Sequence, residues 1–237
     1  MIPHSLRKVL SKIKRTIMPR PAAPGKDLWG KGERVDIVYR NNLQFEKFDI
    51  YQKSHYRRYE YAVTLINPGD VCGDFACGTG YGSLMMAAKA KQVIGADINA
   101  EVIAEIRKRY KQTRHVDFQV KNLLELDLKS VFDALISFET IEHFAEDDIY
   151  KLLHIYHRAL KPGGKFIFST PYMQERTEAA VHMGFHLTFY IDEHKIKQWL
   201  DAAGFELVRL KYQNYATHSL EDNLADKDFI ICVAKKR

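Results

Sequence analysis

Closely spaced glycines follow a short apolar run in the segment VCGDFACGTGYGS, residues 71–83. Gly78 and Gly80 allow the backbone to turn tightly and to approach a ligand without interference from a Cβ atom. If the apolar run is a strand that leads into a helix, this loop lies at the carboxyl edge of a parallel sheet, where open α/β folds bind ligands. The segment therefore predicts a ligand-binding loop.

Two carboxylates restrict the ligand that this loop could hold. Asp97 ends the next apolar run, 17 residues after Gly80, where an acidic side chain can accept hydrogen bonds from ribose hydroxyls. Asp74 ends the first apolar run, where its charge would repel a phosphate and attract an amine or a sulfonium cation. A nucleoside with a cationic tail, such as S-adenosylmethionine, fits this pair better than the pyrophosphate of NAD.

A second group of polar residues follows the fourth apolar run, in the segment FETIEHF. Glu139, Glu142 and His143 lie within one helical turn, and His186 follows in HMGFHLTFY. Such side chains can remove a proton from a hydroxyl nucleophile, and as mixed oxygen and nitrogen ligands they can hold Mg²⁺, Mn²⁺ or Zn²⁺. Alternatively, Glu142 and His143 cap the loop before the next helix. His143 could also act as a base without a metal.

Apolar, β-branched runs alternate with segments of helical periodicity along most of the chain. Strands are predicted at residues 71–76, 92–97, 116–121, 133–138, 165–170, 206–213 and 228–235. Helices are predicted at residues 45–67, 80–90, 99–111, 146–160 and 192–203. This alternation implies a parallel sheet that is covered on both faces. The last two strands have no obvious helix between them and should form an antiparallel pair at one edge of the sheet.

The positive charge of the chain is unevenly distributed. The net charge is +6, and residues 1–26 contain seven Lys or Arg residues and no acidic residue. The remainder, residues 27–237, is close to neutral and is expected to form a single domain. Apolar residues recur at helical spacing among the basic residues of 5–17. This pattern predicts an amphipathic helix that contacts an anionic membrane surface or a partner, and a solvated arm is the alternative.

The composition of the chain also indicates where in the cell the protein is located. No apolar segment approaches the ~20 residues that cross a bilayer. The chain has three cysteines without metal-ligand pairing, which indicates reduced thiols. We therefore expect a cytoplasmic protein, peripheral at the inner face of the membrane if the arm binds lipid.

Several motifs occur in the order that is seen in class I S-adenosylmethionine-dependent methyltransferases, and the chain resembles that family. The motifs are DFACGTGYGS, the acidic strand end at Asp97, FDALISFETIEHF and ALKPGGKFIFSTP. SHYRRYEYA and FETIEH are similar to methyltransferases encoded with bacterial glycan-assembly genes. The resemblance covers roughly residues 45–237. It implies a Rossmann-like α/β fold, with helices on both faces of a mostly parallel seven-stranded sheet that has an antiparallel edge strand.

The resemblance also implies the cofactor, S-adenosylmethionine with S-adenosylhomocysteine as product, and the residues that bind it. Asp97 would bind the ribose, Ile98 would pack on the adenine, and Asn122 would accept a hydrogen bond from the adenine amino group. Arg58 would pair with the methionine carboxylate, or else it is a helix-surface arginine. The implied cofactor-binding positions are Arg58, Asp74, Ala76, Gly78, Gly80, Asp97, Ile98, Asn122, Leu123 and Phe138.

The pattern ExxEH with a later histidine resembles the metal site of small-RNA 2′-O-methyltransferases. It is also similar to the corresponding segment of ubiquinone-pathway O-methyltransferases. The resemblance implies a divalent metal held by Glu139, Glu142, His143 and His186, and catalytic roles for Glu139, His143 and His186.

These patterns predict methyl transfer to a hydroxyl of a small-molecule or glycan acceptor. Residues 172–191 would form an acceptor lid, and the helix at residues 45–67 would lie over the active site. RNA 2′-O-methylation is an alternative, although the neutral body lacks the positive surface that phosphates require. N-methylation of an amino sugar also remains open. The charge of Asp74 argues against a NAD-dependent oxidoreductase. The retained cofactor residues argue against a non-enzymatic scaffold.

Overall fold

The computed structural model describes residues 34–39 and 43–237, and the structural statements below refer to these residues. The basic arm at residues 1–26, with the membrane or partner contact expected for residues 5–17, lies outside the described residues. The helices are α2 (Ile50–Leu65), α3 (Tyr81–Ala87), α4 (Ala100–Arg109), α5 (Glu146–Ala159), α6 (Glu178–Met183) and α7 (Glu193–Ala202). The strands are β1 (Val71–Phe75), β2 (Gln92–Asp97), β3 (Val116–Val120), β4 (Phe132–Phe138), β5 (Leu160–Pro171), β6 (Phe205–Gln213) and β7 (Phe229–Lys236). Short 3₁₀ turns are η1 (Phe45–Lys47), η2 (Leu123–Glu125) and η3 (Ile141–His143).

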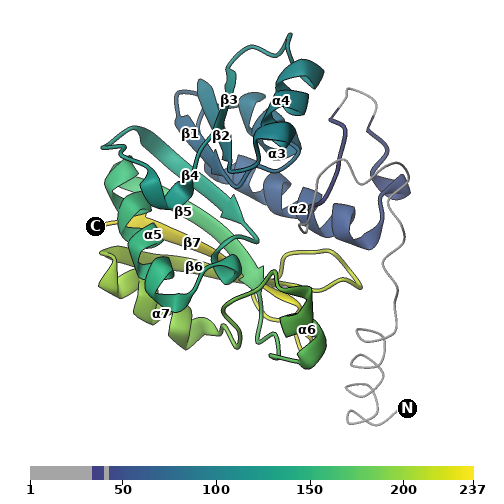
Figure 1. The fold of residues 1–237 in the computed structure, drawn as a ribbon, viewed down its shortest axis with the longest axis vertical. Coiled ribbons are helices and arrows are strands. Elements are labelled where there is room, and N and C mark those ends of the chain that lie inside the picture. Colours follow the sequence, from purple (N-terminus) through teal and green to yellow (C-terminus); the bar gives the residue numbers. More distant parts are fainter. Residues whose placement is uncertain (1–33, 40–42) are drawn as a thin grey trace. The chain divides into compact units, whose positions relative to one another are not determined.

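The strands of the described residues form one seven-stranded sheet in the order β3-β2-β1-β4-β5-β7-β6 (Figure 1). Neighbours from β3 to β5 are parallel, and β7 is antiparallel to both β5 and β6. The predicted fold class is confirmed, with the antiparallel pair β6–β7 at one edge of the sheet. The chain order reverses at β1, whose neighbours are β2 and β4. At such a switch point, the loops after the strands diverge and leave room for a ligand.

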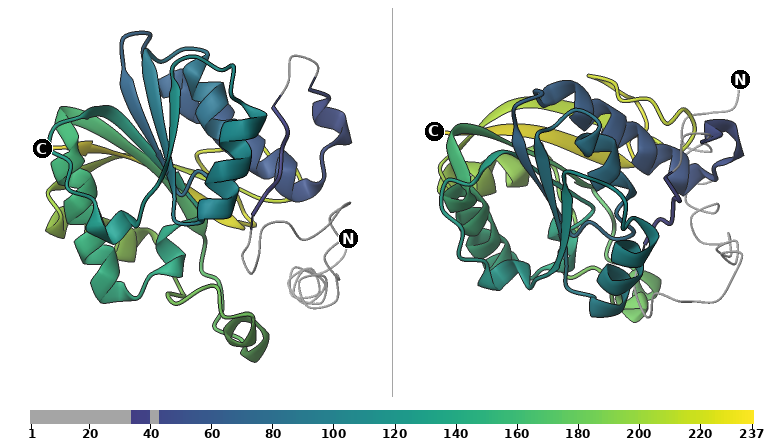
Figure 2. Two further views of the ribbon diagram at one scale, coloured as in Figure 1. Left: turned by 45° about the horizontal axis from the view of Figure 1, so that its top comes forward. Right: turned by 90° about the horizontal axis from the view of Figure 1, so that it is seen from above.

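Helices cover both faces of the sheet (Figure 2). One apolar cluster joins the sheet to α2 and α3, and the other joins it to α5 and α7. The central strands are buried along almost their whole length, because both of their faces meet helices. This burial explains why they are continuous apolar runs in the sequence and do not alternate with polar residues.

Helix α2 begins later than its periodicity predicts because a capping box fixes its start. The Asp49 carboxylate accepts a hydrogen bond from the Gln52 N–H, and the Gln52 side chain accepts one from the Asp49 N–H. The buried face of α2 is partly polar and consists of Ser54, Arg58, Tyr59 and Ala62. This face places a charged side chain inside the protein beneath the carboxyl edge of the sheet.

The expected lid at residues 172–191 contains α6, which the sequence analysis did not predict. Thr177 caps the start of this helix by accepting a hydrogen bond from the Ala180 N–H, and Gly184 ends it with φ +70°. A helix of 6 residues is too short to show a full apolar repeat, and so periodicity could not reveal it.

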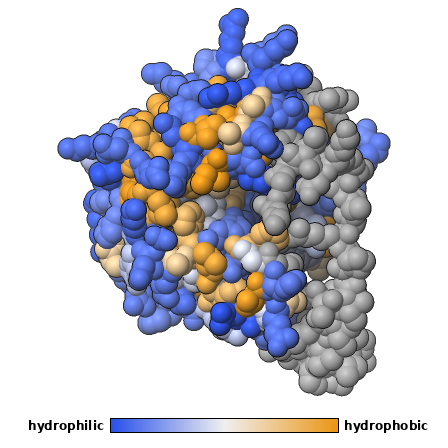
Figure 3. Space-filling view, viewed as in Figure 1, coloured by the Kyte–Doolittle hydropathy of each residue, from blue (hydrophilic) through white to orange (hydrophobic). Residues whose placement is uncertain are grey.

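Apolar side chains on the face shown in Figure 3 occur in separate groups between hydrophilic side chains. Of the described helices, none combines the length and the apolar character that crossing a bilayer requires.

Close packing of α3 on α2 generates a stability prediction. A Cβ atom at Gly82 would lie 2.1 Å from the ring of Tyr59. We therefore expect Gly82→Ala to lower the free energy of unfolding by about 1–3 kcal/mol, although alanine favours helices more than glycine does. Urea unfolding followed by circular dichroism measures this change.

The matched control is Gly69→Ala, because a Cβ atom there would meet nothing within 4 Å. The control should change the free energy of unfolding by less than about 0.5 kcal/mol. Equal stabilities of the two variants would contradict the close contact between α2 and α3.

Candidate functional site

The glycine loop and Asp97 are directly connected at the ends of β1 and β2. Asp97 Oδ2 accepts a hydrogen bond from the Gly78 N–H at 3.1 Å, and Oδ1 accepts one from the Asn99 N–H at 2.9 Å. Asp97 is only 4% exposed. Gly78 and Gly80 have φ values of +50° and +77°, a region that glycine adopts readily. The loop that the sequence predicted therefore holds a buried carboxylate at the carboxyl edge of the sheet.

Ala76 takes part in the same turn, with φ +60°. For an alanine, this left-handed conformation costs about 1–2 kcal/mol, because Cβ approaches the following carbonyl oxygen. The sequence analysis treated Ala76 simply as a small residue. The structure shows that the position also requires an unusual backbone conformation, which a glycine would adopt without strain.

Asp74 does not face the ligand edge in the way that its position in the sequence suggested. The residue is completely buried, and its carboxylate accepts hydrogen bonds from the hydroxyls of Tyr59 at 2.9 Å and Ser83 at 2.5 Å. Burial raises the pKa of Asp74 to about 6, although both hydroxyls oppose this shift. Asp74 thus joins α2, β1 and α3 through these two hydrogen bonds.

The predicted adenine-side positions differ in their accessibility. Ile98 is 67% exposed, so its side chain is open to a contact with a planar base. Asn122 Oδ1 accepts a hydrogen bond from the Leu124 N–H at 3.1 Å and retains a second lone pair for another donor. Leu123 is the buried residue of the 3₁₀ turn η2, which follows Asn122. Phe138 is also buried, and its ring packs edge-on against Tyr59 with centroids 4.9 Å apart.

Arg58 is fully buried and forms an ion pair with Glu139, from Nη1 to Oε1 at 2.9 Å. Its Nε donates to Gln213 Oε1 at 2.8 Å, and its guanidinium lies 3.9 Å from the ring centroid of Phe229. Among the described residues, Nη2 has no hydrogen-bond partner. Arg58 is therefore not a helix-surface arginine. A buried guanidinium with an unused N–H group is suited to an additional anionic ligand.

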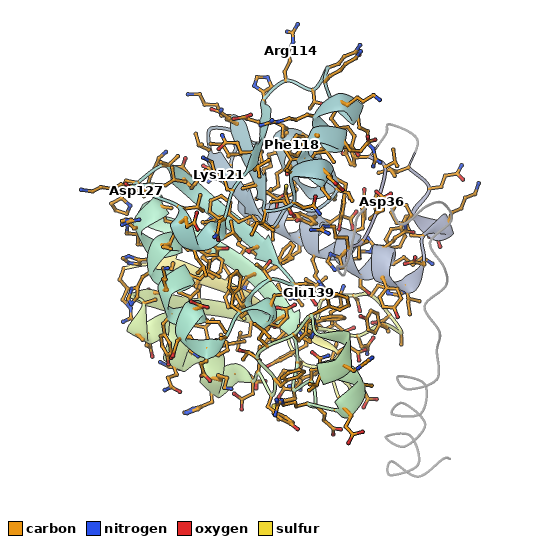
Figure 4. The ribbon with its side chains drawn as sticks, in the orientation of Figure 1. Asp36, Arg114, Phe118, Lys121, Asp127 and Glu139 are labelled. Carbon is orange, nitrogen blue, oxygen red and sulfur yellow. The ribbon has the colours of Figure 1, made fainter. Side chains whose placement is uncertain are left out.

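Glu139 lies at the carboxyl end of β4, near the middle of the view in Figure 4. Its φ of +49° is unusual for a residue other than glycine, and such conformations occur preferentially at functional sites. Its Oε1 accepts a hydrogen bond from the Ser169 hydroxyl at 2.6 Å. The structure thus places the Glu139 carboxylate with Arg58 and Ser169.

Glu142, His143 and His186 form a separate cluster in which one potential ligand atom from each lies within 4.8 Å of the others. Glu139 is not part of this cluster, so the expected group of four becomes a group of three. Glu142 is 1% exposed; its Oε2 accepts from the Thr170 hydroxyl, and its Oε1 has no partner among the described residues. Burial, with the nearby Glu139 charge, raises the pKa of Glu142 well above its usual range.

Both histidines of the cluster are oriented through Nδ1. His143 Nδ1 donates to the Phe185 carbonyl oxygen at 2.7 Å, and His186 Nδ1 lies 2.6 Å from Gln174 Oε1. Since a carbonyl oxygen only accepts, Nδ1 carries the proton in the neutral rings. The lone pair is then on Nε2, where it can bind a cation or accept a proton.

Backbone hydrogen bonds bring the second histidine to the first. The N–H groups of Leu187 and Thr188 both donate to the Glu142 carbonyl oxygen, at 2.8 and 3.1 Å. The imidazole rings of His143 and His186 consequently lie 4.9 Å apart. Residues 43 positions apart in the sequence thus meet at one edge of the sheet.

Comparisons with known proteins agree with this architecture. Residues 73–164 match a family model described as a methyltransferase domain. This part of the chain is therefore similar to a methyltransferase domain. An S-adenosylmethionine-dependent methyltransferase of Mycolicibacterium smegmatis is 38% identical over 96 residues, which cover 40% of this chain and 35% of that protein. The ubiquinone/menaquinone C-methyltransferase of Rubrivivax gelatinosus is 32% identical over 162 residues, which cover 57% of this chain and 62% of that protein.

The resemblance to ubiquinone-pathway methyltransferases is confirmed, and enzymes that methylate oxygen and carbon both occur among the relatives of the domain. The chain spans 35% and 42% of the length of the first relatives that it matches. The N-methyltransferase NodS of Bradyrhizobium japonicum, whose structure contains S-adenosylhomocysteine, shares the fold with a TM-score of 0.62 and 14% identity. The match covers 84% of this chain and 94% of NodS. The names of these proteins therefore do not select the atom that is methylated.

Three contacts that shape the site were not predicted from the sequence. Tyr59 holds Asp74, Gln174 orients His186, and Arg34 lies 3.4 Å from the Asp97 carboxylate. Tyr59 directly follows Arg58 in the segment that resembles the family, which was a usable signal. Gln174 and Arg34 lie in irregular segments, where spacing alone does not indicate a partner.

The buried carboxylate of Asp74 predicts a pH dependence of stability. Its pKa is about 6 in the folded protein and about 3.9 in an unfolded chain. The folded protein therefore holds a proton that the unfolded chain releases. This contribution to stability is fully present below about pH 4 and is lost as the pH rises through about 6.

We expect the free energy of unfolding of the wild type to fall between pH 4.5 and pH 7 by about 2 kcal/mol more than that of Asp74→Asn. Urea titrations at the two pH values measure the difference, and the variant accounts for the other titrating groups. Parallel pH profiles would show that Asp74 does not titrate in this range.

Proposed function

We propose that the protein transfers a methyl group from S-adenosylmethionine to a hydroxyl of a small-molecule or glycan acceptor. The observation that carries the proposal is the cluster of Glu142, His143 and His186, whose ligand atoms lie within 4.8 Å of one another. Glu142 and His143 follow β4, which is the neighbour of β1, and the glycine loop begins at the end of β1. A site for proton removal and a site for a nucleoside therefore share one edge of the sheet.

Residues on both sides of the switch point would hold the cofactor. The Asp97 carboxylate would accept hydrogen bonds from the ribose, and the exposed Ile98 would cover one face of the adenine. Arg58 Nη2, buried and without a partner among the described residues, would donate to the methionine carboxylate. When bound, S-adenosylmethionine supplies a methyl group on a positively charged sulfur, which is already a strong electrophile. The protein must then mainly align the acceptor and exclude water.

The residues of the cluster also fit a divalent cation. Glu142 Oε1 is a buried oxygen without a hydrogen-bond partner among the described residues, which a cation would satisfy. The Nδ1 partners of both histidines leave Nε2 as the ligand atom, and such outer partners are typical of metal-binding histidines. One carboxylate and two imidazoles suit Zn²⁺ or Mn²⁺ better than Mg²⁺, which prefers oxygen ligands. A bound cation would lower the pKa of an acceptor hydroxyl.

The side chains of the cluster have roles with or without a cation. His143 and His186 can each accept a proton at Nε2, because the hydrogen bond at Nδ1 fixes the tautomer. Glu139 forms an ion pair with Arg58 and would help to position the cofactor end of the site. We infer that residues 172–191 cover the acceptor, since their backbone is bound to Glu142 through Leu187 and Thr188.

Metal binding tests the proposed role of the cluster without knowledge of the acceptor. We expect the wild type to bind Mn²⁺ or Zn²⁺ in calorimetric titrations, and Glu142→Gln to bind at least about 10-fold more weakly. S-adenosylhomocysteine should bind to both proteins with affinities that agree within about two-fold, because Glu142 is not among the residues assigned to the cofactor.

Glu206→Gln is the matched control, since Glu206 is exposed on β6. It should leave the binding of both metal and S-adenosylhomocysteine unchanged. Equal metal affinity of Glu142→Gln and the wild type would refute the metal site.

A screen of nucleotide sugars, catechols, amino sugars and RNA ends, with and without EDTA, then identifies the acceptor. Transfer to amines alone would contradict the proposed hydroxyl acceptor.

A further inference from the structure

We infer that Arg34 is a counter-ion that occupies the Asp97 carboxylate in the ligand-free protein and is exchanged for the ribose hydroxyls when the nucleoside binds. The inference rests on the proposed function, because it concerns the same adenosyl site. It adds a residue that sets the affinity of that site and that no motif of the sequence indicates.

The hydrogen bonds around Asp97 show which partner can leave. Arg34 Nη2 lies 3.4 Å from Oδ1, and the two side chains are 17% and 6% exposed. The other partners are the N–H groups of Gly78 and Asn99, which the glycine loop and the start of α4 hold in place. A carboxylate has about four lone-pair positions, and two ribose hydroxyls require two of them. Of these three partners, only the Arg34 guanidinium can leave the Asp97 carboxylate without a change in the backbone of the glycine loop or of the start of α4.

A well-anchored segment, the strap (residues 34–39), places Arg34 at this point. Ile37 is 1% exposed and belongs to the apolar cluster beneath α2 and α3. The Val35 carbonyl oxygen accepts a hydrogen bond from the hydroxyl of Thr79, in the glycine loop, at 3.2 Å. Asp36, labelled in Figure 4, forms an ion pair with Arg109 of α4 at 3.2 Å. The strap therefore crosses the edge where the nucleoside would bind, and Arg34 is held beside Asp97 by its neighbours.

The exchange has a measurable consequence for affinity. A ligand that must displace an internal partner binds more weakly than it would to the vacant carboxylate. Added salt screens an ion pair between partly exposed side chains. The affinity of the wild type for an adenosyl compound should therefore increase with ionic strength, whereas a neutral residue at position 34 should abolish this increase.

Calorimetric titration with S-adenosylhomocysteine at low and high salt tests the exchange. We expect Arg34→Gln to lower the Kd by about two- to five-fold at low salt, with little further change when salt is added. Arg34→Lys retains the charge and should resemble the wild type, including its salt response. Arg209→Gln is the matched control, because Arg209 is exposed on β6 at the opposite edge of the sheet. It should behave as the wild type does.

Each outcome decides a separate point. Unchanged affinity in Arg34→Gln, or weaker binding, would overturn the exchange while leaving S-adenosylhomocysteine as a ligand. Absence of binding in the wild type and in every variant would instead overturn the proposed function. Should Arg34→Gln fail to fold by circular dichroism, the salt response of the wild type decides alone, and a decrease of affinity with salt contradicts the exchange.

Discussion

The buried ion pair between Arg58 and Glu139 is the interaction on which the organisation of the site depends. A guanidinium that is removed from water must be paired and hydrogen-bonded, since an uncompensated buried charge costs several kcal/mol. Arg58 meets this requirement through Glu139 at the end of β4 and Gln213 at the end of β6. One side chain of α2 thereby ties the helix to the parallel and the antiparallel parts of the sheet. Its Nη2 group has no hydrogen-bond partner among the described residues.

The two polar regions of the site follow from the topology around this pair. Asp97 and the glycine loop lie at the ends of β2 and β1, and Glu142 and His143 of the second region follow β4. Because β1 lies between β2 and β4, both regions face the same edge of the sheet. The left-handed conformations of Ala76 and Glu139 occur where these strands end. Backbone strain at these two residues thus lies where the protein would meet its ligands, and the surrounding architecture maintains it.

Much of this arrangement could be predicted from the sequence, because it depends on periodic burial and on local motifs. The alternation of strands and helices predicted the sheet, and the glycine loop and Asp97 lie at the predicted strand ends. The directions in which individual side chains point could not be predicted. Asp74 has the residue type for a cationic ligand, yet it points into the protein toward Tyr59 and Ser83. Glu139 likewise forms an ion pair with the buried Arg58 and is not part of the cluster with the histidines. These side-chain directions depend on contacts between segments that are distant in the sequence, and the spacing of residues along the chain does not reveal such contacts.

The most direct test of the central claim compares two ligands that differ in the group that Arg58 would hold. S-adenosylhomocysteine carries an amino-acid group with a carboxylate and an ammonium, whereas 5′-methylthioadenosine has the same nucleoside and a thioether but neither charge; the Arg58 variant then isolates the contribution of the carboxylate. Calorimetry should show that the wild type binds S-adenosylhomocysteine at least about 10-fold more tightly, and that a folded Arg58→Gln variant loses most of this preference. Equal preference in the wild type and the variant would contradict the assignment of the buried guanidinium to the cofactor.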